Sequence, residues 1–311
     1  MSTLEEIHTD ARQTPEWGKY MESIGWETKT VDGVAISIRQ VRPFTHSLIK
    51  IAHSKDPMPF AAIDKIATEH KALFIIIEPH VINYDEKAYR EHGYMVSKIK
   101  SSIKTTRLID LRPESEKEIW KSFSENAQRN IKKAEKNGLE VRHISMADSN
   151  NYHYFNIFHK LYSQLGKRKN FYTHPYQESR DKMLAFKDST VISFAYEKDS
   201  DEPIACVWYS WFDKTLAYFH VGINQTGYDK LANYLLVWEG VKMGKQKGLE
   251  VLDFEGVFDK RSPGENKSWK GYTEFKERFH GQLVEYPDSW IKIYNKPYKI
   301  FYLCATTIFP S

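Results

Sequence analysis

The chain has 311 residues, more than one domain usually contains, so two domains are expected. Hydrophobic residues make up 41% and charged residues 28%, a composition that excludes a disordered chain, a collagen-like repeat and a membrane-embedded bundle. The net charge of +4 is too small for a uniformly basic nucleic-acid-binding protein, so a polyanionic partner would have to meet local groups of basic residues.

The cysteine and histidine content argues against covalent cross-links and metals. Only Cys206 and Cys304 are present, which excludes a disulfide framework and a zinc cluster, and the 12 histidines show no metal-ligand spacing. We therefore expect no metal and no disulfide. The chain does not open with a basic segment followed by an apolar run, so we expect no signal peptide, and a reducing cytoplasm fits the composition.

An apolar stretch, residues 300–309, closes the chain and is too short to cross a bilayer, which takes about 20 residues. Three lysines precede it, at Lys292, Lys296 and Lys299. The stretch is therefore either a packed terminal helix or a peripheral contact with an anionic membrane surface.

The first part of the chain predicts an α/β domain over residues 1–105. Thr14-Pro15 is typical of a helix start, and Gly25 of its end. Alternating apolar residues then predict strands, and the continuous apolar run Leu73–Ile77 predicts a central buried strand. The expected elements are a helix at 16–24, strands at 34–40 and 48–52, a helix at 61–71 and a strand at 73–77.

The pattern restarts at residue 106 and predicts a second domain over residues 106–285. A long helix is expected from Glu114 to Asn137, with Gly138 as its stop. The other expected elements are strands at 106–111, 191–197, 204–212, 216–223 and 251–254, and helices at 151–165, 176–186 and 231–247. This order predicts a GNAT-like (N-acetyltransferase-like) α/β fold with mixed sheets flanked by helices. Residues 286–311 are a candidate to pack back on the first domain.

A faint internal repeat supports two related domains. Residues 86–96 and 274–284 share Glu, Arg, His-Gly and Val at matching positions, each copy after the strand that follows a long helix. Glycine is common where helices end, so the match alone is weak support. Ala88 in the first copy corresponds to Lys276 in the second, as if only one domain had kept a catalytic group.

Four basic residues at helical spacing form a stripe between Gln128 and Asn137. They are Arg129, Lys132, Lys133 and Lys136. Residues three and four apart share one helix face, so the stripe can neutralise phosphates of an RNA. The alternative is a solvated helix face opposite an apolar stripe.

Polar aromatic residues lie on a predicted strand at Tyr218 and His220. Alternating side chains of a strand share a face, so both are expected to point in one direction, either into a substrate cleft or into a hydrogen-bonded core. The loop at 259–271 follows a buried strand and is either a cover for the site or a plain surface connection.

Glycine-rich phosphate cradles are absent from the sequence. The entry to the helix near Leu231 has one glycine, Gly227, among bulky residues, whereas acetyl-CoA enzymes of this fold seat the diphosphate on backbone amides there. The sequence therefore disfavours acyl-CoA as the donor.

Five segments in order resemble the FemABX family of peptidoglycan aminoacyltransferases, over nearly the whole chain. They are Gln13–Gly18 with Ile24–Trp26, Leu108–Leu111 followed by Arg129–Ala134, Asn233–Glu239, Leu252–Gly256 and Phe275–Gly281. The chain resembles the compact, FemX-like members, because no long helical insertion interrupts its second domain. The resemblance implies tandem GNAT-like domains and transfer of an amino acid from tRNA to a peptide amine of a peptidoglycan precursor.

The resemblance also assigns roles to individual residues. Phe275 and Lys276 match the catalytic Phe-Lys of the family, Tyr218 and His220 its acceptor-contacting tyrosines, and Asp253 a recurrent Asp. An ammonium near the ester would stabilise the negative oxygen formed by amine attack, and no covalent nucleophile or cofactor is needed. The basic stripe is assigned to tRNA.

Two departures from the family bear on the acceptor. Lys29 is only a neighbour of the position of a nucleotide-binding lysine, and Thr173-His174-Pro175 stands where the family has a phosphate-contacting arginine. The acceptor is therefore either a UDP-linked or a lipid-linked muramyl peptide, or another peptide, and a monomer is expected. Two alternatives stay open: an acyl-CoA-dependent N-acyltransferase, and a non-catalytic RNA-binding or scaffold protein.

Overall fold

The computed structural model describes residues 2–43, 45–99, 102–264 and 267–308. Parts of two predicted segments lie outside the described residues: 265–266 of the loop 259–271, and Phe309 of the terminal apolar stretch. Within the described residues the chain divides into two compact units. The larger unit comprises residues 1–9 and 105–284, and the smaller unit comprises 10–104 and 285–311. Residues 2–9 thus belong to the larger unit, whereas the sequence predicts them in the first domain.

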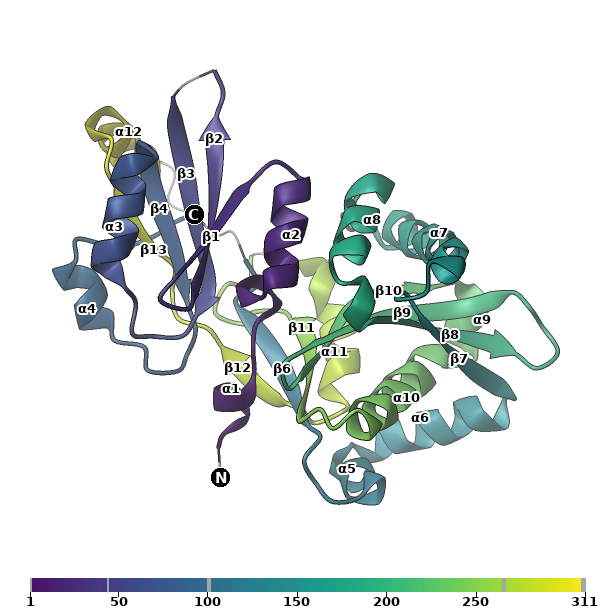
Figure 1. Ribbon diagram of the computed structural model, residues 1–311. Coiled ribbons are helices and arrows are strands. Elements are labelled where there is room, and N and C mark those ends of the chain that lie inside the picture. Colours follow the sequence, from purple (N-terminus) through teal and green to yellow (C-terminus); the bar gives the residue numbers. More distant parts are fainter. Residues whose placement is uncertain (1, 44, 100–101, 265–266, 309–311) are drawn as a thin grey trace. The chain divides into compact units, whose positions relative to one another are not determined.

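The smaller unit is a mixed sheet between helices (Figure 1). Its strand order among the described residues is β1-β2-β3-β4-β13-β5, with β3 and β4 parallel and the other pairs antiparallel. The elements are η1 (Ala11–Gln13), α2 (Pro15–Ser23), β1 (Glu27–Val31), β2 (Val34–Val41), β3 (His46–Ser54), α3 (Phe60–Glu69), β4 (Ala72–Pro79), α4 (Glu86–Glu91), β5 (Met95–Val96), β13 (Trp290–Ile293) and α12 (Lys296–Ile308).

Apolar side chains fill both faces of this smaller sheet. Ile75 and Ile77 pack with α3 on one face, while Phe74, Ile76 and Tyr302 of α12 form a second cluster. The continuous apolar run predicted as a central buried strand is therefore confirmed, because a strand covered on both faces needs no polar alternation.

The larger unit is a second mixed sheet with order β12-β6-β11-β10-β9-β8-β7 among the described residues. The elements are α1 (Leu4–Ile7), β6 (Thr105–Asp110), α5 (Glu116–Ser122), α6 (Glu125–Lys136), β7 (Leu139–Ser145), η2 (Ser149–Asn151), α7 (Tyr152–Lys169), α8 (Tyr176–Ala185), η3 (Lys187–Ser189), β8 (Thr190–Glu197), β9 (Pro203–Phe212), β10 (Thr215–Ile223), α9 (Gln225–Asp229), α10 (Ala232–Gln246), β11 (Val251–Gly256), η4 (Lys267–Trp269), α11 (Lys270–Glu277) and β12 (Gln282–Glu285). The predicted α/β class with two mixed sheets flanked by helices is confirmed.

Helices cover both faces of the larger sheet (Figure 1). One apolar cluster joins the sheet to α5, α6, α10 and α11, and the other joins the opposite face to α7 and α8. The strands of the predicted meander, β8, β9 and β10, are antiparallel neighbours, and the parallel pair β10 and β11 is connected through α9 and α10.

The long helix predicted from Glu114 to Asn137 is wrong, because it is two helices. Phe123 ends α5 in an extended conformation (ψ 151°), and the Ser124 hydroxyl caps α6 by accepting a hydrogen bond from the Ala127 amide at 3.1 Å. Serine accepts such bonds readily outside a helix, so it can start a new helix where apolar periodicity alone suggests continuation.

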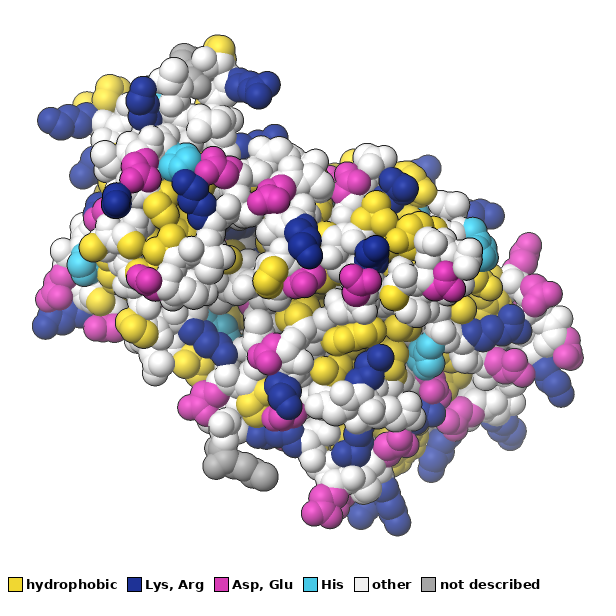
Figure 2. Space-filling model, viewed as in Figure 1, with side chains coloured by type: hydrophobic (Ala, Val, Ile, Leu, Met, Phe, Trp, Pro, Cys, Tyr) yellow, Lys and Arg dark blue, Asp and Glu magenta, His cyan; other side chains and the backbone are white. Residues whose placement is uncertain are grey.

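Charged side chains of both signs are interspersed over the face drawn in Figure 2. Within the described residues, no helix combines the length and the apolarity needed to cross a membrane. Because the two signs of charge are interspersed on this face, a polyanionic partner would meet local groups of lysine and arginine, as the modest net charge predicts.

Candidate active site

Two interruptions of the sheet mark a candidate site in the larger unit. The parallel strands β10 and β11 pair only from Thr215 with Val251 to Ala217 with Asp253. Directly after this pairing, β10 shifts register against β9 between Tyr218 and His220, and β11 shifts register against β6 between Asp253 and Gly256. Bulges of this kind re-aim side chains and are frequent next to active sites.

The bulge in β10 separates two residues that were expected to share a face. Tyr218 pairs with Tyr209, and its ring contacts Tyr209 and Phe254, whereas His220 pairs with Trp208 and contacts Tyr162. Because an extra residue between them breaks the alternation, Tyr218 lies in the cluster that includes α10, and His220 lies among the rings of the α7 face. The predicted common direction is therefore wrong.

Lys276 on α11 lies at the bulge of β11. The side chain is buried, 6% exposed, and its Nζ donates to the carbonyl oxygens of Phe254 at 2.7 Å and Gly256 at 2.8 Å. The ring centroid of Tyr272 lies 4.6 Å from the same nitrogen. Among the described residues no acceptor for a third hydrogen bond from this ammonium is found, so one N–H remains available to a ligand.

Burial lowers the pKa of Lys276 to about 7, against the opposing negative charges of Asp253 and Glu255. A buried charged lysine costs free energy and is retained where the charge has a task. The ammonium at an interrupted strand is therefore the feature of this unit that most resembles an active-site group.

The lowered pKa of Lys276 should make the free energy of unfolding depend on pH. In the unfolded chain a lysine titrates near 10.4, whereas Lys276 titrates at about 7 in the folded protein. Between these two pKa values the unfolded chain binds one more proton than the folded protein. The free energy of unfolding should therefore rise by about 1.4 kcal/mol per pH unit, relative to a Lys276→Met variant. Urea denaturation of both proteins from pH 6 to 9 measures this slope, and a constant difference between them would contradict the assignment.

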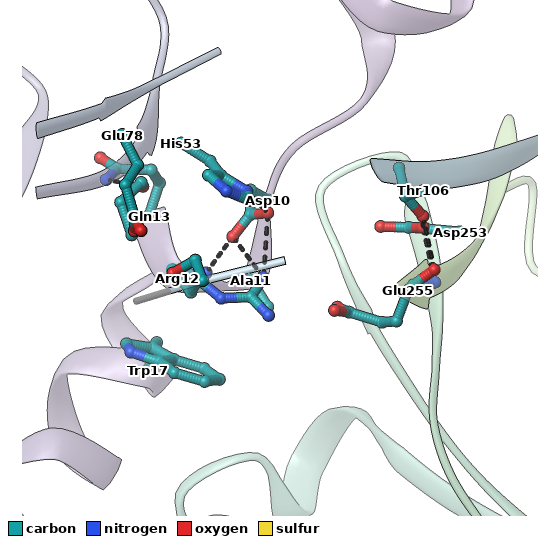
Figure 3. A network of polar contacts seen from close by, with 12 residues as sticks. Asp10, Ala11, Arg12, Gln13, Trp17, His53, Glu78, Thr106, Asp253 and Glu255 are labelled. Atoms are coloured by element: carbon teal, nitrogen blue, oxygen red, sulfur yellow. Dashed lines mark hydrogen bonds and ion pairs between the residues drawn. The ribbon is translucent and has the colours of Figure 1, made fainter. Parts of the chain in front are cut away.

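Asp253, whose negative charge raises the pKa of Lys276, belongs to a buried polar network, and Figure 3 shows it with Thr106 and Glu255. One carboxylate oxygen, Oδ1, accepts from the Glu255 amide at 2.7 Å and from the Thr106 hydroxyl, and Oδ2 lies 2.9 Å from Nε2 of His8. Burial opposes ionisation, but the interactions with His8, Thr106 and the Glu255 amide outweigh it and lower the pKa of Asp253. Asp253 is therefore a fixed, negatively charged anchor of the bulge.

Phe275 has an apolar environment. Its ring packs against Tyr234 and Phe279 with centroids 5.0 and 5.3 Å away. Such packing can fix the position of α11, on which the neighbouring Lys276 lies.

His220 has a different chemistry from Lys276. Burial, together with the positive charge of Lys182, lowers the pKa of His220 well below its ordinary value, so its imidazole is neutral at pH 7. His174 lies nearby, with ring centroids 5.8 Å apart, and its Nδ1 is 2.8 Å from the Glu178 carboxylate. A neutral imidazole among aromatic rings suits recognition of a substrate better than proton transfer at neutral pH.

Lys29 belongs to the smaller unit, on β1. Its Nζ lies 2.8 Å from Nε2 of His70 and 3.3 Å from the Glu27 carboxylate. A second network of that unit, also drawn in Figure 3, joins the Asp10 carboxylate to the Arg12 guanidinium at 3.0 Å and to Nδ1 of His53 at 2.7 Å. Within the described residues, no group of three or more His, Cys, Asp or Glu side chains could hold a metal ion.

The basic stripe lies on α6. All four of its side chains are exposed: Arg129, Lys132, Lys133 and Lys136. The opposite side of the helix buries Ala127, Ile131 and Ala134 in the core. The predicted orientation of this helix is therefore confirmed, while its role stays a prediction.

Three residues of the site are not among the residues predicted from the sequence: His8, Thr106 and Tyr272. His8 meets Asp253 across 245 positions of the chain. Thr106 lies on β6, the antiparallel neighbour of β11, so correct strand pairing would have suggested it. Tyr272 precedes Lys276 by four residues on α11, a spacing that places two side chains on one helix face.

Known proteins share the fold. The sequence model of the FemAB family matches residues 83–197. The crystal structure of FemX superposes with a TM-score of 0.80 at 15% identity, covering 97% of this chain and 99% of that one. The C-terminal domain of a putative lysylphosphatidylglycerol synthetase from Agrobacterium fabrum gives 0.61 at 10% identity, covering 97% and 93%. The protein L-PGS from Bacillus licheniformis gives 0.56 at 12%, covering 94% and 96%. No curated protein matches the sequence.

The FemAB family model thus matches one segment of the chain, and the whole chain shares its fold with FemX.

Proposed function

We propose that the protein transfers an amino acid from aminoacyl-tRNA to an amine of a peptidoglycan precursor peptide, and so forms an interpeptide bridge. The observation that carries the proposal is the buried Lys276 ammonium, which lies between two carbonyls of the β11 bulge and retains one unused N–H among the described residues. The match of residues 83–197 to the FemAB family and the likeness in fold to FemX support the same reaction class.

The reaction needs few protein groups. The neutral acceptor amine attacks the ester carbonyl, a C–N bond forms, and the carbonyl oxygen becomes an oxyanion that accepts a hydrogen bond from Lys276. Collapse breaks the C–O bond to the terminal ribose, and the proton lost by the amine ends on that ribose oxygen. No electrons are exchanged with an outside reagent, so the proposal includes no cofactor.

The partners follow from this chemistry. The exposed basic stripe on α6 is proposed to bind phosphates of the tRNA, and the aromatic rings around His220 are proposed to contact the acceptor. We place the reaction in the cytoplasm, where charged tRNA is made, and propose that a monomer carries it out on a UDP-linked or lipid-linked muramyl peptide.

The direct test is a transfer assay. The protein is incubated with tRNA charged with one amino acid at a time and with UDP-muramyl pentapeptide or its lipid-linked form, and the acceptor is weighed by mass spectrometry. We expect one acceptor to gain one aminoacyl residue, and only when the tRNA is charged. A gain that occurs with acetyl-CoA instead would favour the acyl-CoA alternative, and RNA binding without any product would favour a scaffold.

One structural feature bears on the acyl-CoA alternative. A Cβ on Gly227 would lie 2.6 Å from the Ile204 carbonyl oxygen, so this glycine is required for close packing of α9 on β9. The glycine has a packing reason for its presence and gives no support to a diphosphate cradle.

A peripheral membrane contact is predicted for α12. Lys296, Lys299, Ile300 and Leu303 are exposed at spacings of three and four, and Ile300 is 66% exposed. Each lysine near an anionic bilayer contributes about 1 kcal/mol. In vesicle sedimentation we expect anionic vesicles to retain the protein, and a Lys296→Gln, Lys299→Gln double variant to weaken retention about tenfold or more. Equal binding to zwitterionic vesicles would contradict this prediction.

A further inference from the structure

The N-terminal segment is fastened to the sheet of the larger unit. The helix α1 is capped by Thr3, and the residues that follow it bind the turn before β10. The Thr9 amide donates to the Thr215 hydroxyl at 3.0 Å, and the Thr9 hydroxyl donates to the Asp213 carboxylate at 3.0 Å. Arg112 donates to the Ser2 carbonyl at 2.7 Å. These contacts hold the segment on either side of His8.

His8 is the point at which this segment enters the polar network of the site. Its side chain is fully buried, and its Nε2 lies 2.9 Å from Oδ2 of Asp253. The carboxylate therefore has one oxygen on the imidazole and the other on the β11 bulge, where it accepts from the Glu255 amide and the Thr106 hydroxyl.

The bulge itself has a conformation that needs support. Glu255 has φ of +57°, in the left-handed region that residues other than glycine rarely adopt. Its amide is held by Asp253, and its carbonyl oxygen lies 2.8 Å from the Thr106 hydroxyl, whose single proton is shared between this carbonyl and the Asp253 carboxylate. The residues on either side, Phe254 and Gly256, supply the two carbonyls that hold Lys276.

We infer that His8 is a positioning residue for Lys276, acting through Asp253 and the Glu255 bulge. The imidazole fixes the rotamer of the carboxylate, the carboxylate fixes the strained backbone, and the backbone aims two carbonyls at the ammonium. The activity part of this inference rests on the proposed function, whereas the coupling of His8 to the Lys276 side chain does not.

Loss of the imidazole should also change the charge around Lys276. The titratable groups that face its ammonium are Asp253 and Glu255 of β11, Tyr272 of α11 and Tyr218 of β10. Without His8, the buried Asp253 carboxylate loses a stabilising partner and holds a proton more readily. A less negative Asp253 stabilises the charged form of Lys276 less, so Lys276 should lose its proton at a lower pH.

Three variants test this chain of contacts. His8→Leu fills the space without a hydrogen bond, and His8→Gln places an amide N–H near the position of Nε2. His8→Asn has the same amide on a shorter side chain that does not reach it. Thr9→Val is the matched control, because it removes a contact of the same segment without touching Asp253. The midpoint of the Lys276 titration is read by NMR of protein labelled with carbon-13 at lysine Cε, and single-turnover transfer is measured in parallel.

We expect His8→Leu and His8→Asn to lower the Lys276 midpoint by at least half a pH unit and the transfer rate at pH 7 at least tenfold. His8→Gln should recover most of both values, and Thr9→Val should match the wild type. If Leu and Asn variants keep the wild-type midpoint, or if Gln and Asn behave alike, the inference is overturned, whatever happens to thermal stability. If His8→Leu does not fold, the comparison of Gln with Asn decides. Failure of the wild type to transfer an aminoacyl group would overturn the proposed function, and the NMR titration would still decide the role of His8.

Discussion

Replacing Lys276 by methionine is expected to lower the rate of aminoacyl transfer about 100- to 1,000-fold, with little change in substrate binding. The ammonium is needed most when the ester oxygen becomes negative, so its loss raises the barrier more than it weakens the ground-state complex. Methionine is unbranched and apolar, and it fills a similar buried space without the charge. Single-turnover transfer from charged tRNA measures the effect.

The matched control for this variant is Lys270→Met. Lys270 lies on the same helix, α11, but is exposed. Its replacement should leave the transfer rate within about twofold of the wild type, as is usual for a surface substitution. Equal rates for wild type and Lys276→Met, in protein that remains folded, would remove Lys276 from the mechanism.

Neutralising the basic stripe on α6 should weaken RNA binding strongly. The change of Arg129, Lys132, Lys133 and Lys136 to glutamine removes up to four phosphate contacts. Each contact contributes roughly 0.7 to 0.9 to the slope of log affinity against log salt, so the slope should fall by about 3. Filter binding of tRNA between 50 and 200 mM salt measures it. The expected loss of affinity at 50 mM salt is on the order of tenfold to a hundredfold.

A charge-matched variant distinguishes the stripe from overall charge. Lys19, Lys65, Lys71 and Lys87 are exposed lysines of the smaller unit. Changing these lysines to glutamine removes the same number of positive charges, four, as the stripe variant does, and lowers the net charge from +4 to 0 in the same way. We expect this variant to keep most of the salt slope. If both variants lose the same affinity, the stripe on α6 is not the RNA site.

The helices and strands follow from local sequence signals to a large extent. Thr14 caps α2, and Pro15 occupies its first turn, as the sequence predicts. The apolar run at Leu73–Ile77 lies in β4, where it is covered on both faces. These features are set by neighbours in the chain, so a sequence reading can find them.

The candidate site depends on contacts that local signals do not carry. The bulge at Phe219 reverses the face of His220, and periodicity gives no warning of an inserted residue. His8 and Asp253 meet only after the N-terminal segment has packed on the sheet. The resemblance of residues 275–281 to a family points to Lys276, whereas its burial and its two carbonyl acceptors are features of the structure alone.

The internal repeat gains meaning from topology. In each sheet, a parallel strand pair is followed by a short helix: β3 and β4 by α4, and β10 and β11 by α11. Ala88 of α4 packs against the core of the smaller unit, whereas Lys276 of α11 holds a buried charge at a bulge. Similar places in the two units therefore hold a packing residue in one case and a buried charged group in the other.

The most direct test of the central claim is the pH dependence of single-turnover transfer to an acceptor whose amine is already neutral at pH 7. If the protonated form of Lys276 stabilises the oxyanion, the rate should fall as the pH rises through about 7, the pKa that burial gives this lysine. A rate that instead rises through the same range would show that the neutral amine of Lys276 is the active form, and would contradict a mechanism based on its positive charge.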